Sequence, residues 1–178
     1  MPMTRQRGFT LIETLVVVAL ICVLAAIAMP MLLRAKQSGN EASAIAALRT
    51  IISAQYMFSS SCGGGFFAPD LTVLGRAPSG SNPFIGEDLG AAATVVKGSY
   101  NITMGSTGGA SSNAPPSCNG QAAATDTAGY WATATPSLNA GDLAFGTNGA
   151  GAIYQALQQT ALAMTDTAAP AGSTILDR

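Results

Sequence analysis

The feature that most constrains this chain is one long apolar segment close to its N-terminus. From Phe9 to Leu33 the sequence reads FTLIETLVVVALICVLAAIAMPMLL, 25 residues that carry a single charge, Glu13. A helix of that length extends about 37 Å, whereas the hydrocarbon core of a bilayer is about 30 Å thick. No other segment of the sequence is as long and as apolar. The sequence therefore predicts one membrane-spanning helix.

Basic residues lie on both sides of this segment. Arg5 and Arg7 precede it and favour a cytoplasmic N-terminus, whereas Arg34 and Lys36 follow it and favour the reverse orientation. We expect the N-terminal pair to dominate, which leaves the rest of the chain outside the cytoplasm. A cleaved secretory signal peptide and a simple anchor are the alternatives. The apolar region of a signal peptide, about 7 to 15 residues, is shorter than this one.

Glu13 separates these interpretations. An ionised carboxylate inside hydrocarbon costs about 2.5–3.5 kcal/mol on insertion scales, and a simple anchor gains nothing from it. A buried charge persists when a partner of opposite charge meets it. A free α-amine at the start of the apolar segment is such a partner, and a neighbouring copy displaced along the helix axis supplies it more easily than the same chain does. Glu13 therefore indicates assembly.

The composition excludes several function classes. Only 10% of the residues are charged, against a typical fraction of about 25%, and the formal net charge is −1. Eight scattered basic residues form no basic stripe, so we predict no nucleic-acid partner. The sequence contains no histidine, which excludes histidine bases and histidine-ligated metals. We predict no catalytic residues, metal or cofactor. Among catalytic arrangements, a Ser–Lys dyad through Lys97 is the one that this composition still allows.

The N-terminal sequence resembles a known family. The stretch RQRGFTLIETLVV, residues 5–17, is similar to the N-terminus of type IV prepilins and of the related type II secretion pseudopilins. The resemblance rests on the short basic leader, the junction between Gly8 and Phe9, the position of Glu13, the apolar run and Pro30 near its end. It covers about thirty of the 178 residues.

The resemblance implies a processing pathway and a mode of assembly. A prepilin peptidase would remove residues 1–8 by cutting after Gly8 and would methylate the new terminal amine of Phe9. The family's glutamate, here Glu13, is understood to pair with the terminal amine of an adjacent subunit. The implied partners are further copies of the chain in a helical filament, the peptidase, and the pilus or type II secretion assembly machinery.

Two residues within residues 9–33 need separate interpretation. Pro30 removes a helical hydrogen bond and is predicted to kink the helix near the membrane surface. Cys22 lies in the segment before this proline, where many members of the family have a glycine, and we interpret it as a small apolar residue.

The helix is predicted to continue through residues 34–61 as an amphipathic segment. Ile45, Leu48 and Ile52 recur at helical spacing, with polar residues between them. A serine run at residues 59–61 and a glycine run at residues 63–65 indicate its end.

Residues 62–178 are predicted to form a β-rich head, which makes the fold class α+β: a long helix packed on a small antiparallel sheet. Residues 62–89 look like a loop, with Phe66, Phe67 and Phe84 available to pack on the helix. Strands are predicted at residues 93–96, 99–104, 130–135, 143–145 and 152–155. Residues 155–164 are predicted to extend as a short helix, and residues 165–178 to form a loose or lightly docked tail.

The head carries two cysteines and three separated aspartates. Cys62 and Cys118 lie outside the membrane in the predicted topology, and we expect them to pair and close a loop of about 57 residues. Two separate thiols are the alternative. Asp126, Asp142 and Asp166 are too dispersed in the sequence to identify a calcium site.

The resulting prediction is a structural subunit of a type IV pilus, made as a single-pass precursor in a bacterial inner membrane with its N-terminus in the cytoplasm. The alternative within the same family is a type II secretion pseudopilin, whose filament stays in the periplasm. A membrane-anchored periplasmic enzyme is the remote alternative from another class. The long, Gly- and Ser-rich, weakly charged head favours the surface pilus.

Overall fold

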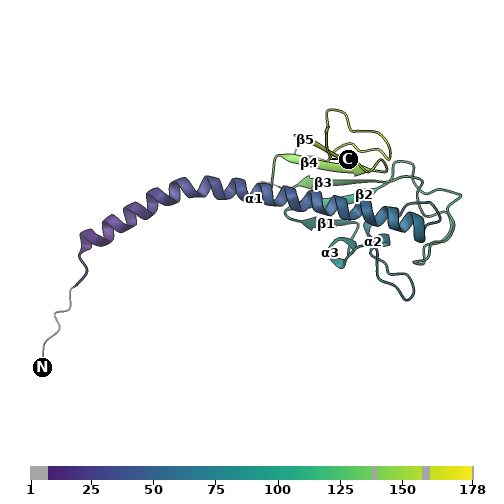
Figure 1. Ribbon diagram of the computed structural model, residues 1–178, viewed down its shortest axis with the longest axis horizontal. Helices are drawn as coiled ribbons and strands as arrows, with labels where there is room; N and C mark the ends of the chain where they lie inside the picture. The colour runs from purple at the N-terminus through teal and green to yellow at the C-terminus, as the bar shows by residue number, and fades with distance from the viewer. Residues whose placement is uncertain (1–7, 138–139, 158–160, 178) are drawn as a thin grey trace, which may run out of the picture. The chain divides into compact units, whose positions relative to one another are not determined.

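The computed structural model describes residues 8–137, 140–157 and 161–177, which divide into one unit up to Lys36 and another from Gln37 onward (Figure 1). Each unit is described by itself. One helix, α1 (Leu11–Ser61), contributes residues to both. It begins two residues after the predicted start at Phe9 and is assigned without a break through Pro30. A kink at that proline stays a prediction.

The head contains a six-stranded antiparallel sheet in which every strand pairs with its neighbours in the sequence, in the order β1 to β6 (Figure 1). The strands are β1 (Thr94–Lys97), β2 (Tyr100–Gly105), β3 (Trp131–Pro136), β4 (Leu143–Asn148), β5 (Ile153–Leu157) and β6 (Thr174–Asp177). Antiparallel neighbours of this kind need no crossover connection. The predicted α+β fold is confirmed, as are the first five strands.

The second half of α1 packs on one face of this sheet. Leu48, Ile51 and Phe58 are fully buried and join one apolar cluster with residues of the inner strands, among them Ile102 and Phe145. Their successive spacings of three and seven residues place them on one side of a helix.

The apolar stripe predicted on this helix, Ile45, Leu48 and Ile52, agrees with the buried face at Leu48 but not at its two ends. Leu48 is at the centre of the contact, whereas Ile45 and Ile52 are only partly buried beside it. Ile51 occupies the place expected for Ile52.

One polar side chain lies within this buried face. The amide of Gln55 is completely buried, and its Nε2 donates to the Ala68 carbonyl at 2.8 Å while its Oε1 accepts from the Ala68 N–H at 3.0 Å. Because both ends of the amide are paired, its burial does not carry the cost of an unsatisfied polar group. Gln55 therefore holds the chain after α1 against the helix.

The segment predicted to be a loop, residues 62–89, contains two short helices, α2 (Leu71–Leu74) and α3 (Glu87–Gly90). The Asp70 carboxylate caps α2 by accepting from the N–H groups of Thr72 and Val73. A Cβ on Gly75 would lie 2.7 Å from backbone atoms of Gly90, so this close approach needs glycine.

Aromatic contacts hold this segment on α1, as predicted for two of the three phenylalanines. The rings of Phe84 and Phe58 lie 5.4 Å apart edge to face, and those of Phe67 and Tyr56 lie 6.4 Å apart in the same arrangement. Such pairs add stability beyond the burial of apolar area. Phe66 makes no ring contact with a described residue.

The C-terminal segment differs from its prediction. Residues 155–157 belong to β5 instead of a helix, and residues 158–160 of the predicted helix lie outside the described residues. The segment predicted to be a loose or lightly docked tail is not loose, because it contains β6, which pairs with β5 at the edge of the sheet. Leu162 and Met164 pack in a second apolar cluster with Tyr154.

The carboxylate of Asp166 ties this segment to the loop after β2. It accepts from the Ser106 hydroxyl at 3.0 Å and from the N–H groups of Thr107 and Gly108 at 2.9 and 3.2 Å. Three hydrogen bonds to one carboxylate form a local network that the separate positions in the sequence did not indicate.

Candidate assembly surface

The first turn of α1 is built by two threonines and Glu13. The Thr10 carbonyl accepts from the N–H groups of Glu13 and Thr14 at 3.1 and 3.3 Å, and the Thr10 hydroxyl donates to the Glu13 carboxylate at 3.3 Å. A carboxylate in the first turn also interacts favourably with the helix dipole. The Thr10 contact was not predicted, although a threonine three residues before a glutamate is the pattern of a capping box.

The remainder of this unit is an apolar surface that nothing in the chain covers. The large apolar side chains from Phe9 to Leu33 are between 47% and 81% exposed in the structure. This helix is long and apolar enough to cross a membrane by length and composition. A helix that is apolar all round is stable when lipid or protein surrounds it.

The predicted processing and assembly residues lie together at the start of this surface. Gly8 and Phe9 precede α1 and are exposed, and Glu13 follows within its first turn. A Cβ on Gly8 would meet no atom within 4 Å, so the fold itself does not require glycine at this position. Cys22 lies further along the helix as an exposed free thiol.

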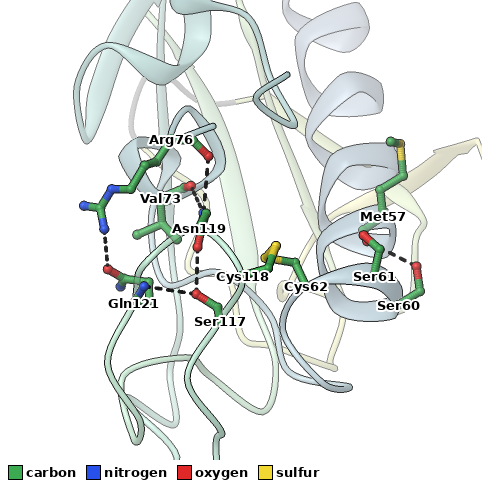
Figure 2. The surroundings of a disulfide bond; sticks show 10 residues. All are labelled: Met57, Ser60, Ser61, Cys62, Val73, Arg76, Ser117, Cys118, Asn119 and Gln121. Atoms are coloured by element: carbon green, nitrogen blue, oxygen red, sulfur yellow. Dashed lines mark hydrogen bonds between the residues drawn. A yellow bond between two sulfur atoms is a disulfide. The ribbon is translucent and has the colours of Figure 1, made fainter. Parts of the chain in front are cut away.

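The head is closed by the predicted disulfide, whose surroundings Figure 2 shows. Cys62, directly after α1, is bonded to Cys118 with a Cα–Cα distance of 4.9 Å. Beside it, the buried Asn119 side chain donates to the Val73 carbonyl at 2.7 Å and accepts from the Ser117 hydroxyl at 2.7 Å. The disulfide and these hydrogen bonds together fix the loop after β2 against the end of α1 and α2.

The three dispersed aspartates have three different surroundings. Asp166 is the anchor described above, and Asp142 is exposed. Asp126 is completely buried, and neither of its carboxylate oxygens has a hydrogen-bond partner. Burial raises the pKa of Asp126 to about 6, because desolvation disfavours the charged form.

Lys97, the candidate base of a Ser–Lys dyad, has a different partner. Its ammonium group donates to the carboxylate of Asp88 in an ion pair between exposed side chains. The ammonium group is therefore engaged with a carboxylate and not with a serine hydroxyl. The structure therefore does not support the dyad that the remote enzyme alternative needed.

The comparisons with known proteins agree with this arrangement. Residues 3–29 match the model of the prokaryotic N-terminal methylation motif. The type IV wide pilus major component PilA4 of Thermus thermophilus is 41% identical to the chain over 56 residues. The chain therefore matches the N-terminal methylation motif and is similar over part of its length to a type IV pilus component. That alignment covers 32% of this chain and 43% of the relative, so the chain spans less than half of the relative's length. No solved structure matches the chain.

The segment that matches the methylation motif includes most of the apolar part of α1. The apolar helix fits a membrane-anchored precursor, and the disulfide-closed head follows it in the chain.

Proposed function

We propose that this chain is a structural subunit of a type IV pilus and that it polymerises through residues 9–33 of α1. The observation that carries the proposal is the apolar surface exposed on every side of the helix. Lipid covers such a surface while the subunit is in the membrane. Once the subunit leaves the bilayer, equivalent helices of other copies have to replace the lipid, because water contact would cost about 25 cal/mol per Å².

Processing of the leader prepares this helix for assembly. A prepilin peptidase cuts after Gly8 on the cytoplasmic side, where Arg5 and Arg7 hold the leader. The absence of a structural need for glycine at position 8 fits a residue that is selected by the peptidase. Methylation of Phe9 then leaves a terminal amine that stays cationic.

Glu13 sets the position of one subunit against the next. Its carboxylate has the Thr10 hydroxyl as a neighbour in its own chain, and this neutral contact leaves the charge uncompensated. The methylated amine of Phe9 in an adjacent copy supplies the opposite charge when that copy is displaced by four residues, about 6 Å along the helix. An ion pair in an apolar environment thereby fixes the axial register.

A surface pilus is favoured over a periplasmic pseudopilus by two observations. The relative PilA4 is named as a pilus major component. The head is rich in glycine and poor in charge, with 20 glycines and 10% charged residues in the chain, which suits a coat exposed to the medium. Long fibres on the cell surface are the expected product. A secretion defect without surface fibres would instead identify a pseudopilin.

The substitution Glu13→Ala tests this mechanism. The variant should insert in the membrane and be cleaved like the wild type, while filaments seen by electron microscopy should fall at least about 100-fold, because the register pair is lost. Thr14→Ala is the matched control, since it removes a polar group one residue away whose hydroxyl only donates to the Leu11 carbonyl. Normal filaments from Glu13→Ala would refute the proposal.

A further inference from the structure

Two basic residues and one acidic residue lie on α1 shortly after the apolar segment, and none of them forms an ion pair with another residue that the structure describes. Arg34 and Lys36 are exposed, and neither makes an ion pair or a hydrogen bond with a described residue. Five residues after Lys36, the side chain of Glu41 is partly buried against the head. Among the described residues, no ion pair joins Arg34 or Lys36 to Glu41.

The carboxylate of Glu41 lies in surroundings where a positive charge would stabilise it. A side-chain carbon on Gly141 would lie 3.1 Å from the Glu41 Oε1 and would contact the Tyr100 hydroxyl, which places the carboxylate beside the turn before β4. That turn brings Asp142, a second acid, close enough to repel it. Burial and then the charge of Asp142 raise the pKa of Glu41. The hydroxyl of Tyr100 is directed elsewhere, since it donates to the Leu143 carbonyl at 2.9 Å.

The spacing of these charges matches the spacing of the proposed register pair. The amine of Phe9 and Glu13 are separated by four residues, and Lys36 and Glu41 by five. At 1.5 Å per residue the two separations differ by about 1.5 Å, which the flexible four-carbon stem of lysine covers. One axial displacement of a neighbouring copy therefore brings both cations to the level of both carboxylates.

We propose that Lys36 of one copy binds the Glu41 carboxylate of the adjacent copy, as a second register contact of the filament. Arg34 adds a second positive charge opposite the acidic pair of Glu41 and Asp142, so that two cations face two anions. The occupant of this acidic surface is thus a second copy of the same chain. The inference rests on the proposed filament and adds a contact outside the apolar segment.

Charge reversal tests the contact. Lys36→Glu and Glu41→Lys should each lower the yield of sheared filaments about five-fold relative to the membrane pool of subunits, because like charges then meet across the interface. The combined variant should return to within about two-fold of the wild type, since the pair is restored with exchanged signs. Lys97→Glu is the control, because Lys97 already pairs with Asp88 in its own chain.

The filament yields and membrane pools of these variants decide whether the proposed contact between Lys36 and Glu41 exists. Normal yields from both single variants, or a combined variant no better than the single ones, overturn it. A membrane pool that falls for Lys36→Glu alone shows that the cations serve anionic lipid headgroups instead. If these variants assemble normally while Glu13→Ala does not, only the second contact is wrong. If Glu13→Ala assembles as well, the proposed function is wrong.

Chemical cross-linking gives a second readout that does not depend on yield. Filaments carrying Lys36→Cys and Glu41→Cys, with Cys22→Ala to remove the free thiol, should give a ladder of multimers with a short bismaleimide. A contact between two different positions links each copy to the next, whereas either single-cysteine parent yields dimers at most. The cysteines of the native disulfide do not react. Dimers alone from the double variant would contradict the contact.

Discussion

The two parts of α1 differ in what covers their apolar side chains. In the second part, Leu48, Ile51 and Phe58 are fully buried by the chain's own sheet, and polar residues occupy the other side of the helix. In the first part, the apolar side chains surround the helix and all of the large ones are exposed. The second part of α1 therefore belongs to a core that the chain forms alone. The first part needs lipid or other copies of the chain to cover it.

This difference predicts which substitutions destabilise a subunit and which disturb only the filament. Changes in the head should act on the free energy of unfolding of a single chain. Changes in residues 9–33 should leave that quantity unaltered in detergent and act on assembly. The three predictions below test this division on the full-length chain in detergent micelles.

Removal of the disulfide should have the largest effect on the head. The variant Cys62→Ala with Cys118→Ala should have a free energy of unfolding about 4 kcal/mol below that of the wild type, because its unfolded chain regains the conformational freedom of a loop of about 57 residues. Chemical denaturation with and without a reductant measures this. The wild type should lose stability on reduction, and the double variant should not respond. Equal stability with and without reductant in the wild type would contradict the assignment.

A matched pair of leucines tests the division of α1 itself. Leu48→Ala should cost about 3 kcal/mol of head stability, because it opens a cavity at a fully buried position. Leu20→Ala makes the same change where the side chain is 60% exposed, and should change head stability by less than about 0.5 kcal/mol. Thermal unfolding followed by circular dichroism compares them. Equal losses for the two variants would mean that the two parts of α1 are not distinct.

The smallest predicted effect concerns the buried Asp126. Its pKa is about 6 in the folded head and about 4 in an unfolded chain, so the folded state prefers the protonated acid. Stability should be highest below pH 4 and should fall as the pH rises through 6, by about 2 kcal/mol. Asp126→Asn keeps the shape without the charge.

Unfolding curves of the wild type and Asp126→Asn between pH 4 and 8 measure this dependence. The variant should show a flatter profile and be the more stable of the two at pH 8. Parallel profiles would show that Asp126 does not titrate in this range.

The sequence predicted those features that depend on local patterns. The apolar run, the five strands predicted between residues 93 and 155 and the end of α1 are visible as periodicity and turn residues, and the structure contains them with small shifts in their bounds. The alternation of polar and apolar residues in α1 predicted the buried face to within one position, since Ile51 replaced Ile52. The cysteine pair was predicted from the topology.

The rest depends on contacts between distant segments. The C-terminal residues contain few large apolar side chains, but the second face of the sheet offers Tyr154 a partner in Leu162 and Met164. The edge of β5 gives β6 a place to pair. The helix α2 exists because the Asp70 carboxylate caps it within a loop. The contact of Thr10 with Glu13 was the local feature that pattern analysis missed.

The intact mass of subunits sheared from filaments tests the central claim most directly. The account predicts a chain that begins at Phe9, carries one added methyl group on its terminal amine and lacks two hydrogens because Cys62 and Cys118 are joined. A filament subunit that retains residues 1–8, or begins at any other residue, would contradict the account, because the amine that meets Glu13 would then be absent.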